Sequence, residues 1–160
     1  MNEEKIRKRK KILAVASIGG HWMQLLRIIR PLEESFDVVY VSTNPKCENI
    51  VKGSKFYATV DFNRWNFWKS TFAAIQIISV IIKEHPQTVI STGAAPGLLS
   101  IAIGKIFLRD TIWIDSVANV EQLSFCGKVA KKIARHTYTQ WPNLADGKVK
   151  YAGNIFGDGV

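Results

Sequence analysis

Residues 14–28, AVASIGGHWMQLLRI, change their hydrophobic pattern halfway along. The stretch begins inside the short apolar run 12–16, which is typical of a buried β-strand. From His21 to about residue 34 the apolar residues recur at three- and four-residue spacing, which indicates an amphipathic helix. Gly19 and Gly20 separate the two patterns. They either make a tight strand-to-helix turn or let the backbone press against a ligand.

The alternation of buried-type strands with helical segments continues along the whole chain. Strands are predicted at residues 12–16, 37–43, 56–60, 88–92, 111–115, 137–140 and 149–152. Helices are predicted at residues 21–34, 65–83, 96–108 and 120–135. This order predicts an α/β protein with one Rossmann-like, doubly wound parallel sheet covered on both faces. We expect residues 1–10 to form a basic tail and residues 11–160 to form a single domain.

Composition excludes several classes of protein. The chain has 160 residues, of which 47% are hydrophobic, so it is long and apolar enough to form a core. Cys47 and Cys126 fit neither a disulfide framework nor a zinc site, and we interpret them as reduced thiols. No D-x-D motif is present, and we expect no metal site. No run reaches the roughly 18 apolar residues of a membrane span.

The net charge of +9 favours anionic partners, such as a phosphate-bearing substrate, an anionic membrane surface or nucleic acid. Part of this charge lies in residues 5–11, KIRKRKK. The cluster is either a solvated tail, a basic patch beside a membrane or a nucleic-acid contact. Beyond it, aromatic residues do not interleave with basic ones as on a nucleic-acid surface, so we expect no nucleic-acid partner.

Three segments follow predicted strands, where open α/β sheets bind their ligands. They are residues 17–21, 91–97 and 115–122. The first two are rich in small residues and lead directly into helices, whose N-termini attract anions. Neither matches the nucleotide-binding motifs G-x-x-x-x-G-K-[ST] or G-x-G-x-x-G. His21 either caps its helix and faces solvent, acts as a general base, or contacts a phosphate.

Four motifs occur in an order and spacing that resemble one family. They are SIGGH at 17–21, STG at 91–93, LSFCGK at 123–128 and QWPNL at 140–144. Together they resemble the Alg14/PssD family, the acceptor- and membrane-associated subunits of two-component GT-B glycosyltransferases. The resemblance covers the chain from about residue 11 to residue 157. The first loop is also similar to the N-terminal glycine loop of the lipid II glycosyltransferase.

The resemblance implies that this chain corresponds to the N-terminal, acceptor-binding half of a GT-B enzyme. Its partner would be an Alg13/PssE-like subunit that carries the UDP-sugar, so this chain would bind no cofactor and be inactive alone. The acceptor would be a polyprenyl-diphosphate-linked sugar, used for polysaccharide or lipid-linked oligosaccharide synthesis by inverting transfer. The alternative is a non-catalytic membrane scaffold that recruits and activates a separate transferase.

Each candidate site residue then has an implied role. His21 is the first candidate for the general base and Glu121 the second, although Glu121 also suits the first turn of a helix. The implied contacts to the acceptor and its diphosphate are Ser17, Gly19, Gly20, Gly93, Ala94 and Asn119. Asp115 lies in the same third loop as Asn119. The implied partner interface is Gln140, Trp141 and Pro142, beside the glycine-bearing tail at 153–160.

Membrane contact is expected to be peripheral, at the cytoplasmic face of the plasma membrane. The basic cluster would contribute about 1 kcal/mol per residue near an anionic surface. Trp65, Phe67, Trp68 and Phe72 are the candidate apolar contacts, because tryptophan favours membrane interfaces. The other interpretation of these four residues is a satellite core.

Overall fold

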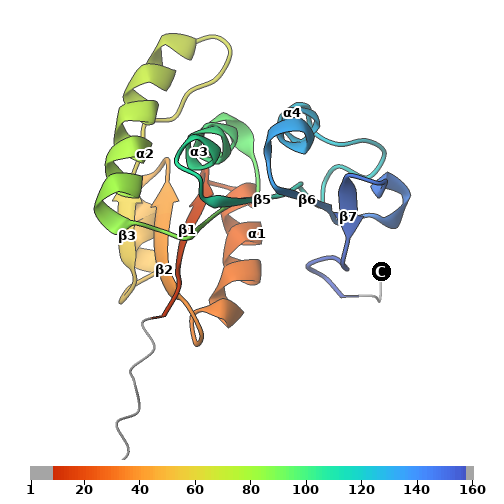
Figure 1. Cartoon of the computed structure of the whole chain (residues 1–160), viewed down its shortest axis with the longest axis horizontal. Helices are drawn as coiled ribbons and strands as arrows, with labels where there is room; N and C mark the ends of the chain where they lie inside the picture. Colours follow the sequence, from red (N-terminus) through yellow and green to blue (C-terminus); the bar gives the residue numbers. More distant parts are fainter. Residues whose placement is uncertain (1–8, 158–160) are drawn as a thin grey trace, which may run out of the picture.

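The computed structural model describes residues 9–157. The predicted basic tail lies largely outside this range, as do the last three residues of the glycine-bearing tail. One seven-stranded, fully parallel sheet organises the described residues, with the order β3-β2-β1-β4-β5-β6-β7 (Figure 1). The strands are β1 (Lys11–Ala16), β2 (Asp37–Ser42), β3 (Lys55–Ala58), β4 (Thr88–Ser91), β5 (Asp110–Ile114), β6 (His136–Thr139) and β7 (Val149–Tyr151).

Four α-helices pack against this sheet: α1 (Gly20–Ile29), α2 (Ser70–Glu84), α3 (Ala94–Ile106) and α4 (Phe125–Ile133). The connections contain 3-10 turns η1 (Arg30–Leu32), η2 (Pro45–Ile50), η3 (Phe67–Lys69) and η4 (Pro142–Leu144). All seven predicted strands are present. The first helix ends five residues earlier than predicted and continues into η1, where Pro31 occupies an early position.

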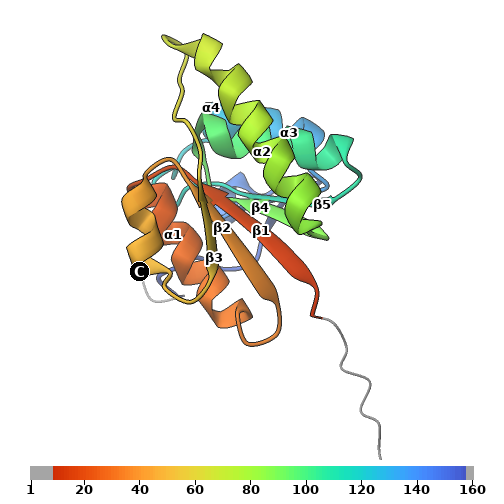
Figure 2. The ribbon, with the colours of Figure 1, turned by 90° about the vertical axis from the view of Figure 1, so that its left-hand side faces the viewer.

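Alternating residues of the strands build two cores, one on each face of the sheet. Leu13 and Val15 of β1 face α2, α3 and α4. Ala14 and Ala16 face the opposite core, which is formed with α1 and η2. Figure 2 shows α1 on one side of the sheet and the other three helices on the other. Coverage of the two faces is therefore less even than the sequence predicts.

The more thinly covered face contains a groove of about 620 Å³ beside α1. Its floor is the sheet, through Ile90, Ile112 and Ile114, and its far wall is residues 152–155 after β7. The groove exists because the helix that crosses from β5 to β6, α4, packs on the opposite face.

At the amino ends of the strands, a buried carboxylate joins three elements. Glu84 at the end of α2 is 4% exposed. Its carboxylate accepts hydrogen bonds from Lys11 Nζ at 2.8 Å, Lys55 Nζ at 3.0 Å and Tyr57 Oη at 2.7 Å. These hydrogen bonds more than offset the cost of burial and lower the pKa of Glu84 to about 2.

Candidate functional site

The strand order reverses between β1 and β4, so their carboxyl ends form the switch point where such sheets bind ligands. The loop after β1 leads into α1 and the loop after β4 leads into α3. The two predicted glycine-bearing segments therefore lie next to each other. Thr92 Oγ1 donates a hydrogen bond to the backbone oxygen of His21 at 2.7 Å, which ties one loop to the other.

The His21 side chain is half-buried at this junction, and its ring orientation is defined. Nδ1 lies 3.0 Å from the backbone oxygen of Thr92. A carbonyl oxygen can only accept a hydrogen bond, so Nδ1 carries the proton. In the neutral ring Nε2 is then the unprotonated nitrogen, which is the tautomer a general base needs. No side chain caps α1, so the interpretation of His21 as a helix cap is wrong, whereas the general base and the phosphate contact both stay predictions.

Gly93 is required by the position of that ring. A Cβ at Gly93 would lie 2.1 Å from His21 Nδ1, and the backbone has a φ of +151°. Ala94, the next residue, has a φ of 65°, a region that residues with a side chain seldom occupy. Such strain concentrates at ligand-binding and active sites. Sequence reasoning selected Gly93 and Ala94 and missed Thr92, which is fully buried and makes both contacts to His21.

Gly19 and Gly20 form the other side of the junction. Gly19 has a φ of +101°, which requires glycine. Gly20 begins α1, and a Cβ there would meet no atom within 4 Å. The chain's own packing therefore gives no reason for a glycine at position 20, whereas close approach of a ligand does. Ser17 is buried behind this loop.

The third predicted segment is organised by Asp115, which is 1% exposed at the end of β5. Its carboxylate accepts hydrogen bonds from Trp113 Nε1 and Asn119 Nδ2, and from both the backbone N–H and the hydroxyl of Ser124. A Cβ at Gly127 would lie 2.4 Å from Asp115 Oδ1. Asp115 thus holds the loop after β5 in place, and the side-chain amide nitrogen of Asn119 donates to it.

Two buried glutamines connect the same segment to the rest of the molecule. The side-chain amides of Gln24 and Gln140 both donate to the backbone oxygen of Asp115, at 3.1 and 3.2 Å. Gln24 was missed, although it is a polar residue within the apolar stripe of the first helix. Gln140 is only 3% exposed, so its predicted place on a partner interface is wrong for the structure described. Trp141 is half-buried and Pro142 exposed.

Glu121 lies outside the His21 junction. It is exposed in an irregular loop, because α4 begins at Phe125 and not near residue 120 as predicted. Ser124 caps the helix by accepting a hydrogen bond from the Gly127 N–H at 2.8 Å. The assignment of Glu121 to the first turn of a helix is therefore wrong. Glu121 instead lines a groove with Lys128 and Lys148.

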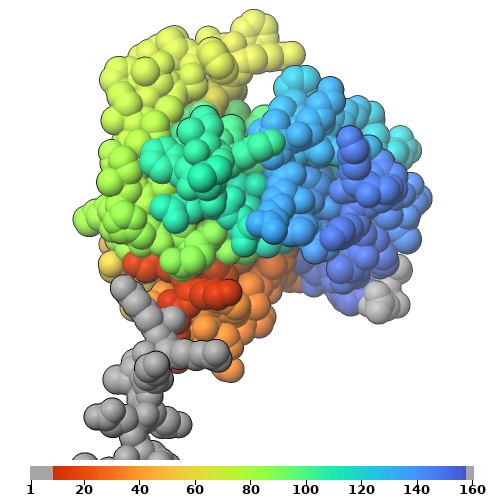
Figure 3. Space-filling view, in the orientation of Figure 1, coloured from red at the N-terminus to blue at the C-terminus, as the bar shows by residue number. Residues whose placement is uncertain are grey.

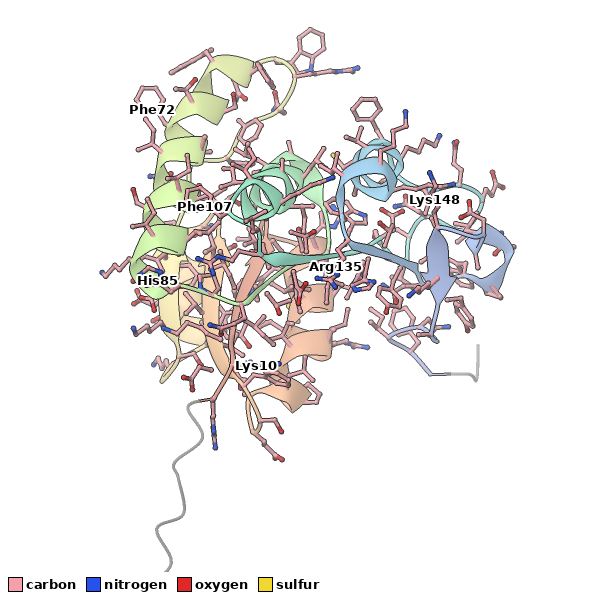
Figure 4. All side chains as sticks on the ribbon, in the orientation of Figure 1. Lys10, Phe72, His85, Phe107, Arg135 and Lys148 are labelled. Atoms are coloured by element: carbon pink, nitrogen blue, oxygen red, sulfur yellow. The ribbon has the colours of Figure 1, made fainter. Side chains whose placement is uncertain are left out.

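The aromatic segment before α2 is exposed, so its interpretation as a satellite core is wrong. Trp65 is 83% exposed and Phe72 is 54% exposed. Phe67 and Trp68 are also exposed. Figure 4 shows the labelled Phe72 on the outer side of α2, pointing away from the sheet. Exposed apolar surface of this extent marks an interaction site.

Cationic side chains lie on these aromatic rings. The Arg64 guanidinium is 5.1 Å from the centre of the Trp65 ring, and Lys69 Nζ is 5.7 Å from that of Trp68. Among residues 9–157 no helix is both long and apolar enough to span a membrane. Within the same range, no group of three His, Cys, Asp or Glu side chains is placed to hold a metal ion.

No protein-family model matches the chain. It is 21% identical to the mouse UDP-N-acetylglucosamine transferase subunit ALG14, over 94% of this chain and 82% of that protein. Among solved structures, MurG from Acinetobacter baumannii superposes with a TM-score of 0.76 at 14% identity, over 91% of this chain and 46% of that one.

A UDP-N-acetylglucosamine 2-epimerase from Rickettsia bellii superposes with a TM-score of 0.73 at 12% identity, over 92% and 46% of the two chains. This chain thus spans about half the length of the solved structures that it matches. The chain is thus similar to ALG14 in sequence, and its single parallel Rossmann-like sheet has the fold of one half of these solved structures.

Proposed function

We propose that this chain is the acceptor-binding subunit of a two-component glycosyltransferase that builds a lipid-linked sugar at a membrane surface. The observation that carries the proposal is the His21–Gly93 junction at the switch point of the sheet. The likeness to ALG14 across 94% of the chain supports the same function. The acceptor is a polyprenyl-diphosphate-linked sugar, and the product extends a polysaccharide or a lipid-linked oligosaccharide.

The diphosphate binds where α1 and α3 begin side by side. Backbone N–H groups at a helix N-terminus are free to donate, and the helix dipole favours a negative charge there. Gly19 and Gly20 leave the space that close approach of the phosphate oxygens needs. Gly93 and Ala94 hold the second helix start beside the first.

His21 Nε2 then accepts the proton of the acceptor hydroxyl. The hydroxyl oxygen forms a bond to the anomeric carbon of the donor sugar while the bond from that carbon to UDP breaks, which inverts the anomeric centre. The backbone oxygen of Thr92 accepts from Nδ1–H throughout and stabilises the imidazolium that forms. Glu121 is the weaker candidate, because it is exposed and lines a separate groove that contains none of the glycine-loop residues.

The UDP-sugar is held by a partner chain of the Alg13/PssE type. In this proposal the chain alone transfers no sugar, because the partner binds the donor. Trp141, Pro142 and residues 153–157 contribute the partner contact. Residues 153–155 line the groove of about 620 Å³ beside α1, so the partner reaches both the C-terminal segment and the open face of the sheet.

The exposed aromatic segment attaches the protein to the cytoplasmic face of the plasma membrane. Trp65 and Trp68 insert at the interface, and Arg64 and Lys69 contact anionic lipid head groups. The net charge of +9 contributes to the same attraction.

The test is reconstitution with the partner and a panel of UDP-sugars on acceptor extracted from membranes. We expect transfer from the mixture and none from either chain alone. His21→Asn keeps a donor for the Thr92 oxygen and removes the base, so kcat should fall about 10²- to 10⁴-fold. Binding to the partner and to membranes should remain. His85→Asn is the control, since His85 lies at the opposite end of the sheet with a φ of 49° that asparagine tolerates.

Transfer by this chain alone would refute the division of the two sites. Full activity of the His21→Asn variant would refute the role of His21 and favour a non-catalytic scaffold.

A further inference from the structure

A second groove lies between the aromatic segment and helices α3 and α4. Its volume is about 770 Å³, within the roughly 300–1,000 Å³ of typical ligand sites. Apolar side chains from three elements form its walls: Phe62, Leu98, Leu99, Ala102, Phe125 and Val129. Among the described residues that line it, Arg64 alone is charged. In Figure 3 the yellow segment before α2 overhangs this part of the surface.

The groove extends to the first turn of α3, next to the candidate diphosphate site. Ala95 lines it and belongs to the first turn of α3, immediately after Gly93 and Ala94. One wall of the groove is therefore a chain neighbour of the residues to which the proposed function assigns the diphosphate. The side chain of Phe62 is only 6% exposed and anchors the overhanging segment, whereas Phe125 on the opposite wall is 81% exposed.

We propose that this groove binds the isoprenoid chain of the acceptor, with the diphosphate at the junction of α1 and α3. The inference rests on the proposed function, because it assumes a polyprenyl diphosphate acceptor. The occupant combines an apolar chain with an anionic head, which matches an apolar groove that includes the first turn of α3 and carries the exposed Arg64. The exposed tryptophans place the mouth of the groove at the membrane surface from which such a chain is drawn.

The test uses the full chain and farnesyl diphosphate, with inorganic pyrophosphate as the probe without a chain. Burying roughly two methylene groups is enough for a tenfold gain in affinity. We therefore expect farnesyl diphosphate to bind at least about tenfold more tightly than pyrophosphate. Ala102→Phe fills the groove and should remove that difference while leaving pyrophosphate affinity unchanged. Ile106→Phe, four residues along the same helix and 76% exposed, is the matched control.

A second measurement needs no variant. Cys126 lines the groove and is half-buried, whereas Cys47 is 2% exposed. Burial and the nearby Asp115 carboxylate raise the pKa of the Cys126 thiol, so alkylation with N-ethylmaleimide is followed at mildly alkaline pH. Farnesyl diphosphate should slow alkylation of Cys126, as measured by mass spectrometry, and pyrophosphate should not.

Three results would overturn the inference. Equal affinity for farnesyl diphosphate and pyrophosphate shows that the groove is not used and refutes the inference directly. If Ala102→Phe abolishes binding to phosphatidylcholine–phosphatidylglycerol vesicles and spares farnesyl diphosphate, the groove holds bilayer lipid. If it abolishes only partner binding, the groove is a protein interface. Transfer with the partner is scored separately, so a failed groove and a failed function are distinguishable.

Discussion

Replacing Gly93 with alanine tests whether the two loops meet as described. The new methyl group would lie 2.1 Å from His21 Nδ1, closer than real Cβ contacts, so the ring must move. The move breaks the 3.0 Å hydrogen bond to Thr92, which costs about 1 kcal/mol. The backbone of Gly93, with a φ of 151° and a ψ of −179°, adds about 2 kcal/mol of strain for any other residue. The variant should lose about 3 kcal/mol of stability.

A double-mutant cycle separates these two costs. His21→Ala removes the ring, so adding Gly93→Ala to it should cost only the backbone strain of about 2 kcal/mol. The double variant should therefore be about 1 kcal/mol more stable than the sum of the single effects predicts. Urea unfolding of the four proteins, followed by circular dichroism, measures this coupling.

The control for the cycle is Gly53→Ala, since Gly53 has a φ of +95° and a Cβ there would meet open space. Its effect should add to that of His21→Ala within about 0.5 kcal/mol. If the stability effects of Gly93→Ala and His21→Ala also add within this margin, the packing of His21 on Gly93 is refuted, and with it the tautomer argument for the base.

Three further variants test other parts of the site and the fold. Gly20→Ala should leave stability unchanged or raise it by up to about 1 kcal/mol, because its Cβ meets open space. Transfer in the reconstituted system should nevertheless fall at least about tenfold. Undiminished transfer would show that Gly20 does not contact the ligand. The pKa of Glu84 is lowered to about 2, so its contribution to stability is complete above about pH 5 and is lost as pH falls toward 2. Glu84→Gln should therefore cost about 3 kcal/mol at pH 7 and much less near pH 2, measured by urea unfolding; an equal cost at both would contradict the ion pairs. Asp115→Asn replaces one carboxylate oxygen by an amide donor, which then faces two of the four donors; it should cost about 2–3 kcal/mol and speed proteolysis within residues 116–124, while an uncleaved loop would deny Asp115 its organising role.

Hydrophobic periodicity predicted which elements exist, because burial on a sheet face or a helix stripe follows directly from residue spacing. It did not predict where two helices begin. The predicted helix begins at residue 65, but residues 65 and 66 lie in a loop, where the Asn63 side chain accepts a hydrogen bond from the backbone N–H of Trp65 at 2.8 Å. The 3-10 turn η3 then precedes α2. The start of α4 depends on Ser124, which is held by Asp115 nine positions earlier. Side-chain hydrogen bonds of this kind leave no periodic trace in a sequence.

The loops that form the candidate site were predictable from the sequence, but the contacts between their side chains were not. Each glycine-bearing segment follows a strand, so its position at the carboxyl edge follows from the topology. The contact between His21 and Thr92 joins residues 71 positions apart and depends on β1 and β4 being neighbours. Strand order is a property of the whole chain. Gln140 shows the opposite failure, because its place in a recognisable motif suggested exposure where the fold uses it to bind the Asp115 backbone.

The arrangement of the buried polar groups explains how the loops at the carboxyl edge of the sheet are held in place. Asp115, Gln24 and Gln140 hold the loop after β5 with hydrogen bonds that are all internal to the chain. Thr92 fixes His21 in the same way from β4. These buried groups use their hydrogen bonds to position backbone, and the proposed function assigns contact with the ligand to the N-termini of α1 and α3 and to the Nε2 atom of His21. A base that is oriented before the ligand arrives needs no reorganisation in the reaction, which is the condition under which a single histidine contributes most.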